Sequence, residues 1–156
     1  MKKVVKFGGS SLASAEQFKK VGNIIRKEES RRYVIPSAPG KRTPDDTKVT
    51  DMLYSCYGQA ILGEDAERDF EEQLEVIKER YNSIIRGLNL DLSLDEEFKT
   101  IRTNFSKKIG RDYAASRGEY LNGIIMAAYL GYEFIDAAEV IVFDENGNFD
   151  GDETHK

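Results

Sequence analysis

A short apolar strand that runs directly into two glycines and two serines constrains the fold of this chain more than any other feature. Residues 4–7 include β-branched and aromatic types, which favour a pleated strand, and Gly8 and Gly9 follow where a side chain would block close approach. A glycine pair can turn its backbone amides toward an anion, and a helix that begins just afterwards adds the positive end of its dipole. The pattern predicts a phosphate-binding loop, to which Lys6 supplies a full positive charge.

Two other interpretations of this segment have to be weighed. A Walker A loop needs a lysine and a hydroxyl residue after the glycines, whereas Lys6 precedes them on the strand, so that motif is excluded. An ordinary strand-to-helix turn stays open as an alternative, since glycines are common at such turns in any α/β unit. The segment alone does not decide between a ligand site and a turn.

The composition is typical of a soluble globular protein, with 156 residues, 40% hydrophobic and 33% charged, enough for one domain or for half of a larger one. No apolar run of about eighteen residues occurs, so we expect no membrane partner. The net charge of −5 is spread along the expected helices, which argues against nucleic acid and for a small phosphate ligand. With one cysteine, Cys56, no zinc-type Cys/His spacing and no signal peptide, we expect a cytoplasmic location and no metal ligands in this part.

The order strand, helix, strand predicts a parallel sheet covered by helices. Ser14 opens a helix that we expect to reach about Glu29, and residues 32–35 form a second short strand. Ligands of such sheets bind beyond the carboxyl ends of the strands, so both the glycine pair and residues 37–41 lie where a site is expected. The polar, turn-rich residues 41–50 are either a mobile loop over that site or a solvated linker.

Three helices are expected in the middle of the chain. Residues 52–62 form the first, and two longer apolar stripes with steps of three and four residues fall within residues 64–109. A short polar link joins the stripes and a capping box at residues 93–96 opens the second, so we expect an antiparallel helical hairpin. Stripes of this kind are packing seams far more often than sites, and we assign the hairpin to structure. They comprise Phe70, Leu74, Ile77, Tyr81, Ile84 and Leu88, and then Leu94, Phe98, Ile101 and Phe105.

A different helix is expected over residues 116–130, because its apolar residues lie on two nearly opposite faces and both faces should be buried. Glu119 projects toward one of them within the first turn, where a poorly hydrated carboxylate needs a partner. The alternative is that Glu119 only caps the helix, as the third residue after Ser116 in a capping box. Two further strands are predicted at residues 132–135 and 140–143.

Three separated segments resemble aspartokinases, a group within the amino acid kinase family. They are KFGGSSL at residues 6–12, PSAPGK at residues 36–41 with the pair Thr50-Asp51, and SRGE at residues 116–119. The first motif would also fit family members that act on glutamate, acetylglutamate, carbamate or uridylate, whereas all three in this order point to aspartokinase. The resemblance implies an α/β fold with three layers, α/β/α, and a mostly parallel sheet, plus the inserted helical hairpin.

The resemblance also implies phosphoryl transfer from ATP to the side-chain carboxylate of L-aspartate, the first step of lysine, threonine and methionine biosynthesis. Lys6, Gly8 and Gly9 would be the catalytic residues. Lys6 would neutralise charge on the transferred group, while the amides of Gly8 and Gly9 and the Ser10 hydroxyl would hold phosphate oxygens.

On the substrate side, the resemblance implies contacts from three regions of the chain. Ser10, Ser37 and Thr50 would provide hydroxyls that face the aspartate. Glu119 would pair with its ammonium group.

The resemblance covers residues 1–156 as the amino-terminal part of a longer catalytic domain. Aspartokinases continue through a second half that binds most of the nucleotide and holds the ligand of the magnesium ion, and then through regulatory ACT domains. ATP and Mg²⁺ are therefore the expected cofactors, the full-length protein is expected to be a homo-oligomer, and residues 1–156 alone are expected to be inactive. Another kinase of the family, for glutamate or acetylglutamate, and a non-catalytic aspartate-binding fragment stay open as alternatives.

Overall fold

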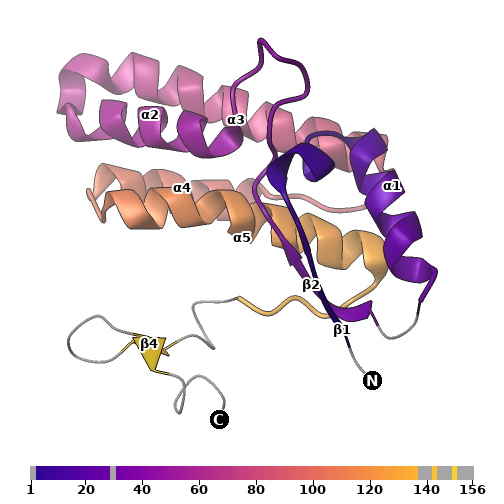
Figure 1. The fold of residues 1–156 in the computed structure, drawn as a ribbon. Coiled ribbons are helices and arrows are strands. Elements are labelled where there is room, and N and C mark those ends of the chain that lie inside the picture. The colour runs from indigo at the N-terminus through magenta and orange to yellow at the C-terminus, as the bar shows by residue number, and fades with distance from the viewer. Residues whose placement is uncertain (1–2, 29–30, 137–141, 144–148, 151–156) are drawn as a thin grey trace.

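The computed structural model describes residues 3–28, 31–136, 142–143 and 149–150 (Figure 1). A short parallel sheet lies beside a layer of long helices, and helix α1 flanks the sheet at one end of that layer. The elements follow one another as β1 (Lys3–Phe7), the 3-10 helix η1 (Gly9–Leu12), α1 (Ala15–Arg26), β2 (Arg31–Pro36), α2 (Val49–Ile61), the 3-10 helix η2 (Gly63–Ala66), α3 (Glu67–Gly87), α4 (Asp95–Ser106), α5 (Arg111–Leu130), β3 (Val142–Phe143) and β4 (Phe149–Asp150).

The two strands predicted at the start of the chain form and pair in parallel, which confirms the α/β class. In their register Lys6 lies beside Ile35 and Phe7 beside Pro36. The ladder extends one residue further, because the Ser37 amide donates to the Phe7 carbonyl at 3.1 Å. The segments that follow both strands therefore leave the sheet at the same end, as a parallel pair requires.

The prediction of a strand at residues 132–135 is wrong, since residues 132–136 form none. The ring of Phe134 instead contacts that of Tyr120 on α5, with 5.6 Å between their centroids, and lies where a side chain at Gly123 would be. A strand is stabilised by its hydrogen-bonded neighbour, and the described residues place none beside this segment. Of the strand predicted at residues 140–143, Val142 and Phe143 form β3, which pairs antiparallel with β4, and the rest lies outside the described residues.

Helix α1 follows from its capping residue and its apolar face. The Ser14 hydroxyl accepts a hydrogen bond from the Gln17 amide, as an N-cap does. Phe18, Val21 and Ile25 are buried on one face. The helix ends at Arg26, three residues before the predicted end at Glu29, because the apolar face ends at Ile25.

Helix α2 packs against both α3 and α5, and α4 lies beside α5 (Figure 1). The rings of Phe70 and Phe105 and those of Tyr81 and Phe98 lie 6.4 and 6.2 Å apart, an order that makes α3 and α4 antiparallel. The capping box predicted at residues 93–96 is wrong, since Leu94 is the N-cap and the Ser93 hydroxyl accepts from the Asp95 amide instead. None of the helices in the described residues combines the length and apolar character of a transmembrane span.

Helix α5 begins at Arg111, five residues before the predicted start at residue 116. Gly110, with a φ of 141°, makes the turn that precedes it, and Gly131, with a φ of 72°, ends it in the left-handed conformation. Its buried residues are Ala114, Gly118, Leu121, Asn122, Ile125 and Met126. Leu121 and Ile125 belong to one of the two predicted apolar faces and Met126 to the other, whereas Ala128 is exposed, so the prediction of two buried faces is confirmed only in part.

Candidate functional site

The loops that follow β1 and β2 touch backbone to backbone. The Gly40 amide donates to the Gly9 carbonyl at 2.8 Å. A Cβ at Gly40 would lie 2.6 Å from the Gly9 carbonyl carbon and 2.8 Å from the Ser10 nitrogen, and a Cβ at Gly9 would lie 3.0 Å from the Ala38 oxygen. Neither position has space for a side chain, so both residues have to be glycine. Their small size lets residues 8–11 pack directly against residues 37–41.

The glycine loop, residues 8–11, presents backbone to solvent at the end of β1. Gly8 and Ser10 are exposed, and Gly9 opens the 3-10 helix η1, whose first amides have no acceptor within the helix. Helix α1 begins at Ala15, as the Ser14 capping signal predicts, so η1 separates its amino terminus from the glycine loop. The arrangement leaves amides and the Ser10 hydroxyl accessible to an anion.

Lys6 lies on the open face of the sheet. Val5 and Phe7 of the same strand pack toward the helices, whereas Lys6 is exposed and shares its face with Val4 and with Ile35 of β2. Within the described residues Lys6 makes no ion pair. Its ammonium group is thus available to a ligand that would lie over the carboxyl end of β1.

The residues predicted to face the substrate lie where α5 crosses the Ser37–Ala38 segment. A Cβ at Gly118 would lie 2.6 Å from the Ala38 Cβ and 3.8 Å from the Thr50 hydroxyl oxygen, so Thr50 and Ala38 both border this part of α5. The buried hydroxyl of Tyr81 donates to the Gly118 carbonyl at 2.8 Å, and burial raises the pKa of this tyrosine. The structure therefore brings Ser37, Thr50 and the Gly118-Glu119 pair into one region.

The structure contradicts both predictions made for the surroundings of Glu119, burial and helix capping. Its side chain is exposed, not placed in poorly hydrated surroundings. The capping-box alternative is also wrong, because Ser116 lies inside α5 and its hydroxyl donates to the Tyr113 carbonyl at 2.7 Å. The capping argument failed because α5 begins at Arg111, which places residue 119 in the third turn. Neither a capping role nor burial accounts for Glu119 in this structure.

Asn122, which the sequence analysis did not single out, reaches the same region from one turn further along α5. It is fully buried, and its Nδ2 donates to the Ser37 carbonyl at 2.7 Å. Its Oδ1 has no hydrogen-bond partner among the described residues. A polar residue on an otherwise apolar helix face was the signal that could have identified it. Asn122 fixes the Ser37 backbone relative to α5.

Arg80 is the second residue that the sequence analysis missed, because it lies within the apolar stripe of α3. It is 4% exposed and donates to backbone carbonyls of Ala13, Gly40 and Thr47. Its guanidinium also lies 3.6 Å from the Asp46 carboxylate. Burial and the nearby Arg42 lower the pKa of Arg80, whereas Asp46 raises it. A guanidinium group keeps its positive charge in proteins.

The polar loop, residues 42–48, is attached to the body of the protein and is not a plain linker. The Asp46 carboxylate accepts from the Arg42 backbone amide at 2.9 Å and from its guanidinium at 2.6 Å. These hydrogen bonds hold the pKa of Asp46 well below its usual range, and the charge of Arg80 adds a smaller effect in the same direction. Val49 then joins the end of the loop to the Pro39 carbonyl at 3.1 Å.

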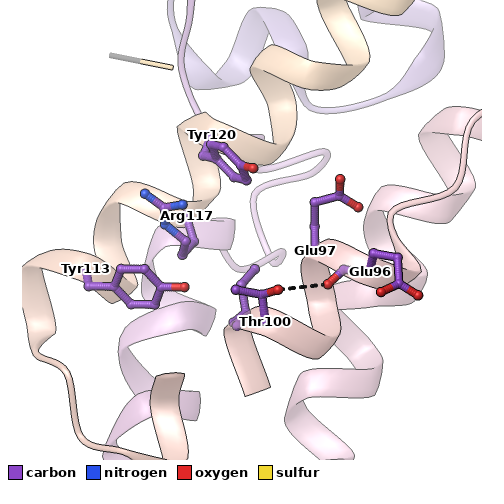
Figure 2. A pocket seen from close by; sticks show the side chains of 7 residues that line it. Glu96, Glu97, Thr100, Tyr113, Arg117 and Tyr120 are labelled. Carbon is purple, nitrogen blue, oxygen red and sulfur yellow. Dashed lines mark hydrogen bonds between the residues drawn. The ribbon is translucent and has the colours of Figure 1, made fainter. Parts of the chain in front are cut away.

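Two cavities lie elsewhere on the helices. One of about 370 Å³ lies between α2 and α3, next to Thr47 and Asp51. The other, of about 160 Å³, lies between α4 and α5 (Figure 2), where the Arg117 guanidinium stacks on the rings of Tyr113 and Tyr120 at 4.6 and 4.4 Å. Neither is lined by the glycine loop or Glu119. Among the described residues, no three His, Cys, Asp or Glu side chains gather as a metal site would require.

Comparisons with known proteins place the chain within one family of kinases. The family model described as "Amino acid kinase family" matches residues 1–155. Aspartokinase 3 of Bacillus subtilis is 37% identical over 159 residues, covering 94% of this chain and 34% of the relative. Chloroplastic aspartokinase 1 of Arabidopsis thaliana is 33% identical, covering 90% of this chain and 25% of that protein. The chain thus spans about a third or less of the length of these relatives.

Solved structures of aspartate kinases have a fold similar to that of this chain. The crystal structure of Clostridium acetobutylicum aspartate kinase superposes with a TM-score of 0.91 at 49% identity, over 99% of this chain and 35% of that one. E. coli aspartokinase III in complex with aspartate and ADP gives a TM-score of 0.63 at 20% identity, over 84% of this chain and 29% of that one. At that identity the second match supports the fold alone.

Proposed function

The chain belongs to the amino acid kinase family, and from this premise we propose that it is the amino-terminal part of an aspartate kinase. The observation that carries the proposal is the contact between the glycine loop and residues 37–41, beside the Gly118-Glu119 pair, in a chain 49% identical to an aspartate kinase. That contact brings the expected phosphate-binding and substrate-binding segments to one end of the sheet.

The chemistry that this arrangement suits is phosphoryl transfer to a carboxylate. The nucleophile is already an anion, so no general base is needed, and catalysis consists of positioning two anions and neutralising the charge on the transferred group. Lys6 supplies the charge, and the amides of Gly8 and Gly9 with the Ser10 hydroxyl hold phosphate oxygens. A positioned donor of this kind stabilises a transition state by about 3 kcal/mol.

The aspartate would be held by residues from three segments. Hydroxyls of Ser37 and Thr50 face the substrate, and Glu119 pairs with its ammonium group. Because Glu119 is exposed here, the bound substrate itself has to supply the partner and exclude the water.

The wider role follows from the same proposal. ATP and Mg²⁺ are the cofactors, with the metal ligand outside residues 1–156. The complete enzyme is a cytoplasmic homo-oligomer that begins lysine, threonine and methionine biosynthesis. Residues 1–156 alone do not catalyse the reaction, because they span about a third of the length of the relatives and leave one face of β1 and β2 exposed.

The test is a chimera in which residues 1–156 replace the matching third of Clostridium acetobutylicum aspartate kinase, called the chimera below. Incubated with ATP, Mg²⁺ and aspartate, it should form acyl phosphate that hydroxylamine traps as hydroxamate. Residues 1–156 alone should form none.

Each alternative gives a different result. Turnover with glutamate or acetylglutamate but not aspartate would assign the chain to a sister kinase. Aspartate binding by a folded chimera without hydroxamate would make it a non-catalytic binding module. Robust hydroxamate from residues 1–156 alone would show that this chain carries a complete site.

A further inference from the structure

Arg80 joins three loops that are far apart in the sequence. Its guanidinium donates to the Ala13 carbonyl at 3.2 Å, to the Thr47 carbonyl at 3.1 Å and to the Gly40 carbonyl. Ala13 follows the glycine loop and η1, Gly40 lies in the loop after β2, and Thr47 lies in the polar loop. One side chain on α3 therefore fixes the relative positions of all three segments that border the candidate site.

Packing alone does not explain an arginine at this position. Its helical neighbours Ile77, Tyr81 and Ile84 are buried apolar or aromatic side chains that pack in the core. A buried guanidinium loses its hydration, and well-packed apolar residues often stabilise such a position as well or better. Arg80 also leaves its Nε without a hydrogen-bond partner among the described residues, so its burial is only partly compensated. What distinguishes an arginine from an apolar residue at this position is the rigid, planar set of hydrogen-bond donors of its guanidinium group.

One carbonyl group that Arg80 contacts, that of Gly40, lies next to the contact between the two loops. Gly40 accepts from Arg80 through its carbonyl while its amide donates to Gly9, so the guanidinium acts one peptide away from the contact between the two loops. Asp46, which lies 3.6 Å from Arg80, also holds Arg42 and thereby closes the polar loop. Removal of the guanidinium would release both connections together.

We propose that Arg80 is a positioning residue, whose contacts with the Ala13, Gly40 and Thr47 carbonyls set the distance between the phosphate-binding loop and the loop that carries Ser37. The inference rests on the proposed function, in which each loop binds one of the two reacting substrates. Each substrate keeps its own contacts when the loops separate, but the in-line approach of the carboxylate to the phosphoryl group is lost. Loss of Arg80 therefore lowers kcat more than it raises either KM.

The kinetic test uses Arg80→Lys and Arg80→Gln in the chimera, each assayed below its own unfolding temperature. Lysine keeps the charge but is a point donor in place of a fork. Both variants should lower kcat by about ten- to a hundredfold, with each KM changed by less than about threefold. Arg86→Gln, on the same helix but exposed and paired with Glu79, is the matched control and should keep normal kcat. A folded Arg80→Lys variant with kcat within about twofold of the parent, or a change confined to KM, would overturn the proposal.

A second readout does not depend on activity. Trypsin can cut residues 1–156 after Lys41, Arg42 and Lys48, and Lys19 and Lys20 on α1 report global unfolding. Arg80→Gln should raise the cleavage rate in the polar loop about tenfold more than on α1, because local opening costs less than unfolding. Equal acceleration at both places, or fast cleavage of this loop in the unmodified chain, would contradict positioning by Arg80. If the chimera is inactive with aspartate, the proposed function fails, and the cleavage ratio alone decides the role of Arg80.

Discussion

The Gly40 amide donates a hydrogen bond of 2.8 Å to the Gly9 carbonyl, and this contact joins the loops that follow the two parallel strands. In the sequence the 3-10 helix η1, helix α1 and strand β2 separate the two glycines. Parallel pairing brings the carboxyl ends of β1 and β2 to one edge, and the lack of a side chain at both positions lets the two backbones touch. The site geometry therefore depends on the space at these glycines.

Gly40→Ala in the chimera should lower turnover strongly. The added Cβ would lie 2.6 Å from the Gly9 carbonyl carbon, and backbone on both sides cannot move aside as a flexible side chain could. We expect a loss of about 1–3 kcal/mol in unfolding free energy and, because the loops separate, a fall in kcat of about a hundredfold. Gly58→Ala on α2 is the control, since nothing lies within 4 Å of its added Cβ. Normal kcat in Gly40→Ala would show that the loop contact is not needed for catalysis.

Lys6→Ala in the chimera should lower kcat by about a hundredfold or more and leave aspartate affinity nearly unchanged. Lys6 is exposed at the carboxyl end of β1 and forms no ion pair within the described residues, so its charge has no structural partner to lose. Steady-state kinetics with ATP and aspartate, and calorimetric titration of aspartate, measure the two effects. Lys3→Ala, on the same strand and paired with Glu28 at 2.6 Å, should behave like the parent. Turnover close to normal in Lys6→Ala would identify Lys6 as a surface charge only.

Glu119→Gln should raise the KM for aspartate by about ten- to a hundredfold, as loss of one partner of a charge pair does. Because Glu119 caps no helix and is exposed, the unfolding free energy should change by less than about 0.5 kcal/mol. Glu75→Gln, exposed on α3, is the control and should leave both quantities unchanged. An unchanged KM together with a lower stability would remove Glu119 from the site.

Local patterns predicted the parts of the fold that local interactions determine. The strand at residues 3–7 and the Ser14 N-cap agree with their sequence signals, because β-branched residues and a capping hydroxyl act within a few residues. The start of α5 was placed at Ser116 because a capping box was the stronger local pattern, whereas Gly110 makes the turn. Residues 132–135 carry strand-forming residue types, but a strand also needs a neighbour, and sequence patterns do not provide one.

The site was predictable to the extent that its residues are glycines and hydroxyls at the ends of strands. The β-α-β order places Gly9 and Ser37 at the ends of paired strands, which it brings together. Thr50 lies in α2, and only the resemblance to aspartokinases pointed to it. Arg80 was not predictable, because its role comes from three backbone carbonyls that only the tertiary fold assembles. Its one signal was a cation inside an apolar stripe, which a long side chain on a helix edge would also produce.

Asp46 gives the stability a specific pH dependence. Its hydrogen bonds with Arg42 depress its pKa in the folded chain below the ordinary value of 3.8. A depressed carboxyl pKa contributes stability that is present above the unfolded pKa and is lost as pH falls through the folded one. Asp46→Asn should therefore destabilise the chain at pH 7, by about 1–2 kcal/mol because Arg42 is half exposed but Arg80 is buried, and the difference should shrink as pH falls below about 4.

The measurement is urea unfolding of residues 1–156 and of the Asp46→Asn variant at a series of pH values from neutral to acidic. Asp45→Asn is the matched control, because Asp45 is the exposed neighbour of Asp46 in the same loop and makes no ion pair among the described residues. Its stability should follow the parent at every pH. A difference between parent and Asp46→Asn that stays constant down to about pH 2 would mean that the carboxylate charge does not act in the folded state. Arg42, Asp46 and Arg80 would then hold the polar loop through contacts that do not depend on the charge of Asp46.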